Sequence, residues 1–138
     1  MKLTQLFEDA QVVPHGVLYH ATPIEYLDSV LRHGIKPSTG GTTFLKRTYE
    51  PRVHLTTRIE AAWDFTMSVN ARRAAEEHVE YVIVHIDPSK LENAIFYEDP
   101  MFSDYGIWTS SAVPPTAIIK TSEVNHDWEP DDDYYDGK

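Results

Sequence analysis

The stretch that decides the fold runs from residue 17 to residue 34 and reads VLYHATPIEYLDSVLRHG. Residues 17–20 form a short apolar run that ends on polar side chains, which is typical of a strand. Thr22, Pro23 and Glu25 then form a capping box with proline at the first helical position. Apolar residues recur at helical spacing beyond it, and Gly34 suits the left-handed end of a helix. We therefore expect a strand that is followed at once by a helix.

A second strand and helix follow the same pattern. Residues 52–56, RVHLT, alternate with a period of two, which predicts a strand. Thr57 is expected to cap the next helix because Glu60 lies three residues further on. This helix would run towards Arg72 and Arg73. Residues 81–86, YVIVHI, are β-branched and almost all apolar, which favours a central strand.

Three shorter strands are expected at residues 94–97, 105–109 and 116–120. Helices thus come early and hairpin-like strands come late, which indicates an α+β fold rather than a regular βαβ alternation. A length of 138 residues fits one domain. We expect an N-terminal lead at residues 1–16, the domain at 17–122, and an acidic, disordered tail at 123–138.

The charge is strongly acidic and unevenly spread. The chain has 12 Lys and Arg against 22 Asp and Glu, a net charge of −10, which argues against non-specific nucleic-acid binding. Residues 123–138 hold seven of the acidic side chains, so this segment could serve solubility, shield a basic patch or engage a partner. The body could still carry a local basic edge built from Lys46, Arg47, Arg52 and Arg58.

Composition also excludes several classes of site. Without cysteine, the chain has no disulfide, thiol nucleophile or Cys-ligated metal. The seven histidines lack metal-ligand spacing, so no metal is expected. No nucleotide-binding glycine motif and no Gly-x-Ser-x-Gly elbow occurs. No secretory signal and no apolar stretch of membrane-spanning length is present, so we expect no membrane partner and a cytoplasmic protein.

Two histidines stand out by position. His20 ends the first expected strand just before a helix, and His54 lies in the second expected strand before another helix. Backbone N–H groups at such places commonly hold anionic ligands. The alternative is that each histidine is a buried, hydrogen-bonded structural residue.

Six short motifs, in order, resemble one known family. They are LYHAT at residues 18–22, YLDSVLRHGI at 26–35, VHLT at 53–56, FY at 96–97, GIWT at 106–109 and VPP at 113–115. Together they resemble the NAD-dependent ADP-ribosyltransferase domain, and most closely its RNA 2′-phosphotransferase branch, over about residues 17–120. The resemblance implies two small, mostly antiparallel sheets around a cleft with flanking helices.

The resemblance implies a transferase with NAD as co-substrate and no metal. Such an enzyme cleaves the glycosidic bond to nicotinamide and passes ADP-ribose to RNA, DNA, a phosphate end or a protein. Its site holds the ribose, stacks the nicotinamide and stabilises an oxocarbenium-like transition state. Only 16 residues, without Arg, precede the first expected strand, so the resemblance does not include the RNA-binding lobe of the full phosphotransferases.

The resemblance also assigns roles to residues. His20 would bind the ribose of the adenosine half, with Tyr19 and Thr22 shaping that pocket. His54, Thr56 and Thr57 would line the strand beside the nicotinamide. The ring would stack on one of three aromatic residues that could equally belong to the core, namely Tyr97, Tyr105 or Trp108.

Phosphate binding and acid–base chemistry would come from other positions. Arg72 or Arg73 would bind phosphate, unless both belong to a solvated helix face. The family's late-strand glutamate has no counterpart in residues 106–111, and Glu98, Asp99 or Asp104 could replace it. Of these three, Asp104 is our catalytic candidate.

Two other functions remain open. The same fold with a degraded site would be a module that binds NAD, ADP-ribose or another nucleotide without turnover. An acidic interaction protein of accessory or phage origin would instead work through its tail.

Overall fold

The computed structural model describes residues 10–38, 51–99 and 104–135. The strands are β1 (Gln11–Val12), β2 (Leu18–Pro23), β3 (Val53–Thr56), β4 (Tyr81–Ile86), β5 (Phe96–Glu98), β6 (Gly106–Thr109) and β7 (Ile118–Glu123). The helices are α1 (Leu27–His33), α2 (Ile59–Ala71) and α3 (Asp132–Tyr135), with 3₁₀ turns η2 (Ile24–Tyr26), η3 (Ala75–Glu77), η4 (Pro88–Lys90) and η5 (Pro115–Ala117).

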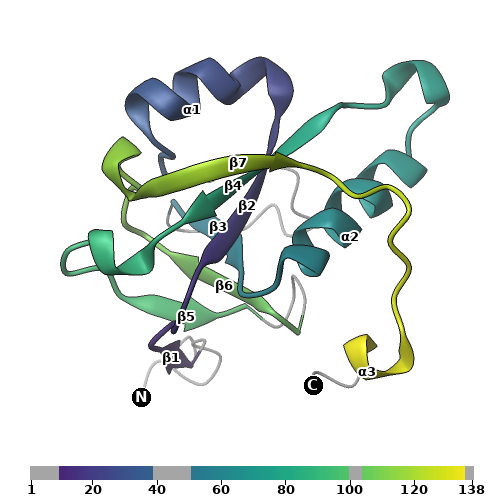
Figure 1. Ribbon diagram of the computed structural model, residues 1–138. Helices are drawn as coiled ribbons and strands as arrows, with labels where there is room; N and C mark the ends of the chain where they lie inside the picture. Colours follow the sequence, from purple (N-terminus) through teal and green to yellow (C-terminus); the bar gives the residue numbers. More distant parts are fainter. Residues whose placement is uncertain (1–9, 39–50, 100–103, 136–138) are drawn as a thin grey trace.

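The described strands form one antiparallel sheet with the order β1-β5-β6-β3-β2-β4-β7 (Figure 1). The prediction of an α+β fold is confirmed. The expectation of two separate sheets differs from this arrangement, because β2 and β3 are hydrogen-bonded neighbours. Their contact is narrow, since Tyr19 opposite Thr56 is their one registered residue pair, whereas β2 pairs with β4 from Leu18 to Pro23. The sheet therefore has a three-stranded half (β2, β4, β7) and a four-stranded half (β1, β5, β6, β3).

Each face of the sheet carries its own apolar cluster. Successive residues of a strand point to opposite faces, so Ile83 and Val84 of β4 belong to different clusters. Val84 packs in the larger cluster with Val30 of α1. Ile83 packs in the smaller cluster with Ala62 of α2. The helices α1 and α2 therefore cover opposite faces (Figure 1).

The first helix begins later than the capping box predicts. Thr22 is the partner of Val82 in the β2–β4 ladder and caps no helix, because β4 offers β2 a partner as far as Pro23. The chain then passes through η2 before α1 begins at Leu27. Gly34 ends α1 as predicted, with φ at 77° and its N–H donating to the Val30 carbonyl at 2.8 Å.

The second helix also lacks its predicted cap. Arg58 is the residue that precedes α2, and no side chain caps this end. The Thr57 N–H donates instead to the Tyr105 carbonyl at 3.0 Å, which draws Thr57 to the segment before β6. Thr57 is therefore used in a tertiary contact rather than a local one.

Both ends of the described chain pack on the domain. The lead supplies β1, a two-residue edge strand on β5 that the sequence pattern did not indicate. Residues 124–135, here called the C-terminal strap, run past α2 and end in α3 (Figure 1). The strap is acidic, but Val124 and Tyr134 are buried, and the Trp128 ring lies 6.3 Å from that of Trp63. Apolar and aromatic side chains of the strap therefore pack on the domain, and the predicted disorder of the acidic tail stays a prediction.

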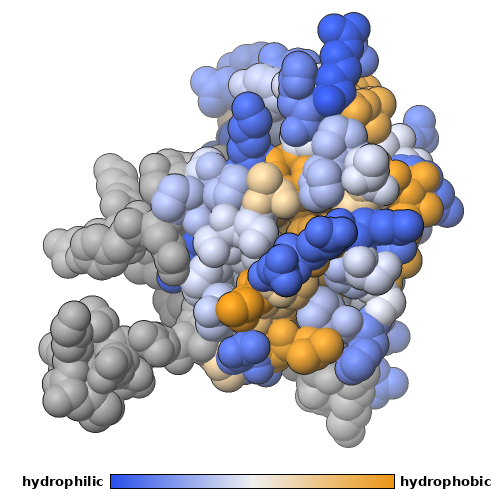
Figure 2. Space-filling model, turned by 90° about the vertical axis from the view of Figure 1, so that its left-hand side faces the viewer, coloured by the Kyte–Doolittle hydropathy of each residue, from blue (hydrophilic) through white to orange (hydrophobic). Residues whose placement is uncertain are grey.

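Large hydrophobic side chains also reach the surface. Figure 2 shows one side of the molecule, where apolar residues form separate patches with hydrophilic residues between them. The exposed large hydrophobics are Val13, Ile24, Tyr26, Leu31, Ile95 and Ile119. Among the described helices, none has the length and apolar character that crossing a membrane requires.

Candidate functional site

One face of the four-stranded half gathers polar and aromatic side chains. Residues directly opposite one another in antiparallel strands point to the same face. Tyr19, which packs under α2, is opposite Thr56, while His54 is opposite Trp108 and Trp108 is opposite Tyr97. The α2 side of the sheet thus continues from the apolar cluster into a surface that we call the polar face, made of Arg52, His54, Thr56, Tyr97 and Trp108.

His20 joins the two strands at the point where they part. Its Nδ1 atom lies 2.8 Å from the backbone oxygen of His54. A carbonyl oxygen only accepts, so the Nδ1 atom of His20 carries the proton in this bond. Burial lowers the pKa of His20, and the proximity of His54 acts in the same direction, although the bond to the carbonyl opposes both. His20 is therefore neutral near pH 7, and its Nε2 atom is an acceptor.

His54 is held by a carboxylate. Its Nδ1 atom lies 2.8 Å from Oδ2 of Asp99, and the exposed fractions of the two side chains are 23% and 8%. Asp99 follows β5, where its N–H donates to the Gly106 carbonyl at 2.9 Å. A carboxylate on one ring nitrogen fixes the tautomer and orientation of the ring. This geometry suits proton transfer through Nε2.

The partner of His54 differs from our catalytic candidate. Asp104 is exposed at the turn before β6. Asp99, named only as one alternative to it, is the carboxylate that contacts His54. The sequence did not distinguish Asp99 from Asp104. The strand register places Tyr97 opposite Trp108 and Trp108 opposite His54, and this register brings Asp99, two residues after Tyr97, to the His54 side chain.

The aromatic residues of the polar face have different roles. The Trp108 ring is stacked with that of Tyr97 at 4.5 Å between centroids and 23° between planes. The Arg52 guanidinium lies 3.8 Å from the Trp108 centroid. Trp108 is only 5% exposed, and its ring lies against both the Tyr97 ring and the Arg52 guanidinium. Tyr97 is half-buried and keeps surface on which a ligand ring could stack.

The other predicted pocket residues divide between packing and surface. Tyr19 packs edge-on against His85 at 5.1 Å between ring centroids. Thr22 is buried and, like His20, points to the face opposite Tyr19. The buried Thr56 hydroxyl donates to the Arg58 carbonyl at 2.9 Å and so shapes the turn into α2. The structure thus brings the His20 ring to the backbone of His54, while the side chains of His54 and Thr56 lie on the polar face. Thr22 lies further along β2.

The two predicted phosphate ligands lie at the end of α2. Arg72 follows the last residue of the helix and is exposed, and Arg73 is half-buried. The Asn70 side chain ties this end to the backbone of Val79, just before β4. The N-terminal end of α2, which follows β3 and His54 in the chain, lies about 20 Å from Arg72 along the helix axis. Two other arginines, Arg52 and Arg58, lie nearer to His54 along the chain. The sequence indicated them only as members of a local basic edge. The other members of that edge, Lys46 and Arg47, lie outside the described residues.

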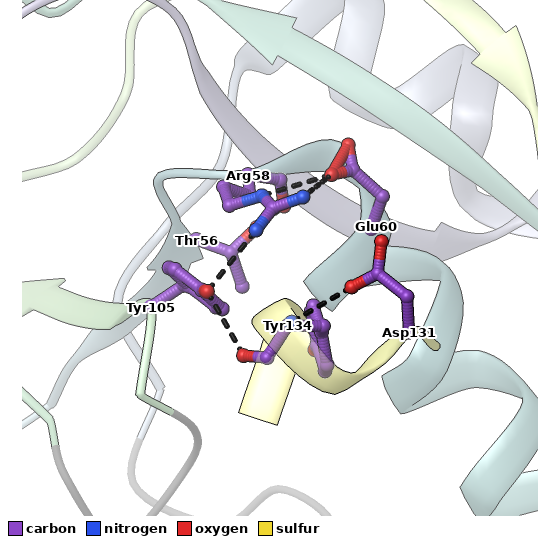
Figure 3. A network of polar contacts seen from close by, with 6 residues as sticks. All are labelled: Thr56, Arg58, Glu60, Tyr105, Asp131 and Tyr134. Carbon is purple, nitrogen blue, oxygen red and sulfur yellow. Dashed lines mark hydrogen bonds and ion pairs between the residues drawn. The ribbon is translucent and has the colours of Figure 1, made fainter. Parts of the chain in front are cut away.

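Arg58 organises a network at the start of α2 (Figure 3). It pairs with Glu60 and donates to the Tyr105 hydroxyl at 3.0 Å. Its guanidinium lies over the rings of Tyr105 and Tyr134, at 4.9 and 5.5 Å from their centroids. The bonds to Glu60 and Tyr105 raise the pKa of Arg58. This network joins the C-terminal strap to the edge of the polar face.

The comparisons with known proteins and the rest of the described surface add the following findings. No protein-family model matches the sequence, and no curated protein is significantly similar to it. Within residues 10–38, 51–99 and 104–135, no three or more potential ligands converge on a metal position. A shallow depression of about 260 Å³ lies at the far end of β2, lined by Pro23, Ile24, Glu25, His78, Val79 and Glu80.

Proposed function

We propose that this protein is an ADP-ribosyltransferase-like enzyme that uses NAD as co-substrate. The observation that carries the proposal is the bond between His20 and the His54 backbone. It joins the LYHAT and VHLT segments, which are far apart in the sequence and supply the two histidines of the motif resemblance. The narrow junction between the halves of the sheet would correspond to the two small sheets of that family.

The proposed reaction is the one that the motif resemblance implies, with His54 and Asp99 in the acid–base role. The bond between the ribose C1′ atom and the nicotinamide nitrogen breaks, and its electron pair leaves with the nicotinamide. A lone pair of the acceptor then forms the new bond to C1′. Because Asp99 engages Nδ1 of His54, the acceptor's proton would pass to Nε2 of that residue.

Two further residues would hold the co-substrate. The neutral His20 would accept a hydrogen bond from a ribose hydroxyl through Nε2. Tyr97 would stack on the nicotinamide ring, with Trp108 as its support. The acceptor is proposed only as a class, a nucleic acid, a phosphate end or a protein side chain.

A second candidate function is nucleotide binding without turnover. The observation that favours it is that β6, which reads GIWT, carries no carboxylate, while Asp99 is engaged by His54. Such a module would hold NAD or ADP-ribose on the same residues. It would lack a carboxylate directed at the acceptor.

Incubation with NAD tests the proposal, with released nicotinamide measured by liquid chromatography and mass spectrometry. We expect release by the unmodified protein and its loss in His20→Ala and His54→Ala. His15→Ala is the matched control, because His15 is exposed and lies outside the site. Calorimetric binding of NAD without release would favour the binding module. If the protein neither binds NAD nor releases nicotinamide, both functions are ruled out.

A further inference from the structure

The C-terminal strap is attached to the residue just before β6. The Tyr105 hydroxyl donates to the Tyr134 carbonyl at 2.9 Å, and the two rings lie 5.3 Å apart (Figure 3). Arg58 donates to the same hydroxyl and lies over both rings. The Tyr105 side chain is therefore fixed jointly by the strap and by the start of α2.

The backbone next to Tyr105 leads directly to His54. Gly106 follows Tyr105, and its carbonyl accepts from the Asp99 N–H at 2.9 Å. The Asp99 carboxylate in turn contacts Nδ1 of His54 at 2.8 Å. A contiguous path of hydrogen bonds and one peptide link therefore runs from the strap to the site.

We propose that Tyr105 is a positioning residue for the His54–Asp99 pair, and that docking of the strap on Tyr105 controls how firmly the pair is held. The proposal deepens the proposed function, on which it rests for its effect on catalysis. Its structural part concerns only this chain. Docked, the strap holds the Asp99 carboxylate on Nδ1 of His54; undocked, it lets the carboxylate and the ring separate.

The strap is suited to such a change because its attachment is local. The strap follows β7 and pairs with none of the described strands. Its one helix, α3, has four residues. Within the strap, the rings of Trp128 and Tyr134 contact each other, and they also contact the rings of Trp63 and Tyr105. Segments with few buried contacts open at a lower free energy than the whole domain. Repulsion among the acidic residues of the strap favours opening, so screening by salt should favour the docked form.

Nuclear magnetic resonance of the full chain tests the proposal through the ring nitrogens of His54. Their ¹⁵N shifts report which nitrogen carries the proton, and the His54→Gln spectrum assigns the signals. We expect the Nδ1–H form in the unmodified protein, because Nδ1 faces a carboxylate. In Tyr134→Ala and Tyr105→Phe we expect a mixture of tautomers.

Two control variants separate this effect from general perturbation. Tyr26→Phe removes a hydroxyl from an exposed tyrosine on η2. Asp127→Asn removes a charge from an exposed position of the strap. Both should keep the Nδ1–H form. Tyr105→Phe keeps the aromatic ring, so it gives the decisive result if Tyr134→Ala does not fold.

The outcomes are distinct from those of the NAD assay. An unchanged Nδ1–H signal in folded Tyr105→Phe would overturn the proposal whether or not the protein uses NAD. A tautomer change in both variants but in neither control would support it. If the unmodified protein releases nicotinamide from NAD, Tyr134→Ala and Tyr105→Phe should release it at least about tenfold more slowly. Small displacements of reacting groups lower a rate by that much or more. Unchanged release alongside a changed tautomer would exclude a positioning role.

Discussion

The Nδ1 atom of His20 lies 2.8 Å from the backbone oxygen of His54, where β2 and β3 part. Beyond the pair Tyr19–Thr56, these strands have no further registered pair. The imidazole therefore adds a hydrogen bond to the β3 backbone at the place where the registered pairing of the two strands ends. The same histidine thus has a structural role in the sheet and a proposed role in the site.

Removing the His20 ring should destabilise the fold. His20→Ala removes this donor from the His54 carbonyl, and the loss of one intramolecular hydrogen bond costs about 0.5–1.5 kcal/mol. Urea denaturation should show a lower midpoint for this variant. His20→Asn, whose amide can donate, should recover part of the loss, and His15→Ala should change little. Equal midpoints for His20→Ala and His15→Ala would refute this role.

Stability should fall in mildly acidic solution. Burial lowers the pKa of His20 and of His85 below the usual 6.5, with the charge of Lys120 adding to the effect on His85. The unfolded chain then binds more protons than the folded one, so the free energy of unfolding decreases as the pH falls through 6.5 towards the lowered values. Urea midpoints at about pH 7.5 and 5.5 measure this decrease. The double variant His20→Asn, His85→Gln should show a smaller decrease, and an equal one would assign it to other groups.

Gly34 should tolerate no side chain. Its φ of 77° disfavours other residues, and a Cβ there would collide with the Val113 carbonyl oxygen. Gly34→Ala should cost about 3 kcal/mol or prevent folding, because strain and a backbone clash add. Gly16→Ala is the matched control, with φ at 96° but no atom within 4 Å of the new Cβ. Its cost should be about 1 kcal/mol, from conformation alone. Thermal melting compares the two variants, and equal losses would show that the clash is relieved.

Asp99 and Asp104 should differ in any activity that uses His54. Asp99→Asn removes the negative charge that orients and stabilises the protonated ring, so nicotinamide release should fall at least about tenfold. Asp104→Asn, at an exposed position, should keep nearly full release. The free energy of unfolding of both variants serves to separate catalysis from stability. Reversed results would return Asp104 to the catalytic position.

Some elements were predictable because their signal is local. The strand at residues 81–86 has the predicted bounds, since a β-branched, apolar run can be buried on both faces. Gly34 ends α1 because only the backbone of that residue matters there. The two predicted helix caps, Thr22 and Thr57, were wrong because their surroundings are not set by neighbouring residues. Thr22 and Thr57 are held by partners in other elements, β4 and the segment before β6, which a local pattern does not contain.

Composition alone described the C-terminal strap incompletely. Its charge predicted disorder and gave no sign that Trp128 and Tyr134 each contribute a ring that packs on distant residues. A few aromatic contacts can anchor a segment whose average hydropathy is low, because burial depends on individual side chains rather than on the mean.

The amino-acid sequence by itself determined the approximate positions of β2 to β7, the α+β class and the prominence of His20 and His54, because alternation and local polarity are properties of neighbouring residues. Only the tertiary structure decided that Asp99 holds His54, that Trp108 stacks on Tyr97 and that the strap reaches Tyr105. The first two contacts join segments whose register is set by strand pairing across the sheet, and the third joins the segment before β6 to residues that follow the last strand. A shift of one residue would turn each side chain to the other face.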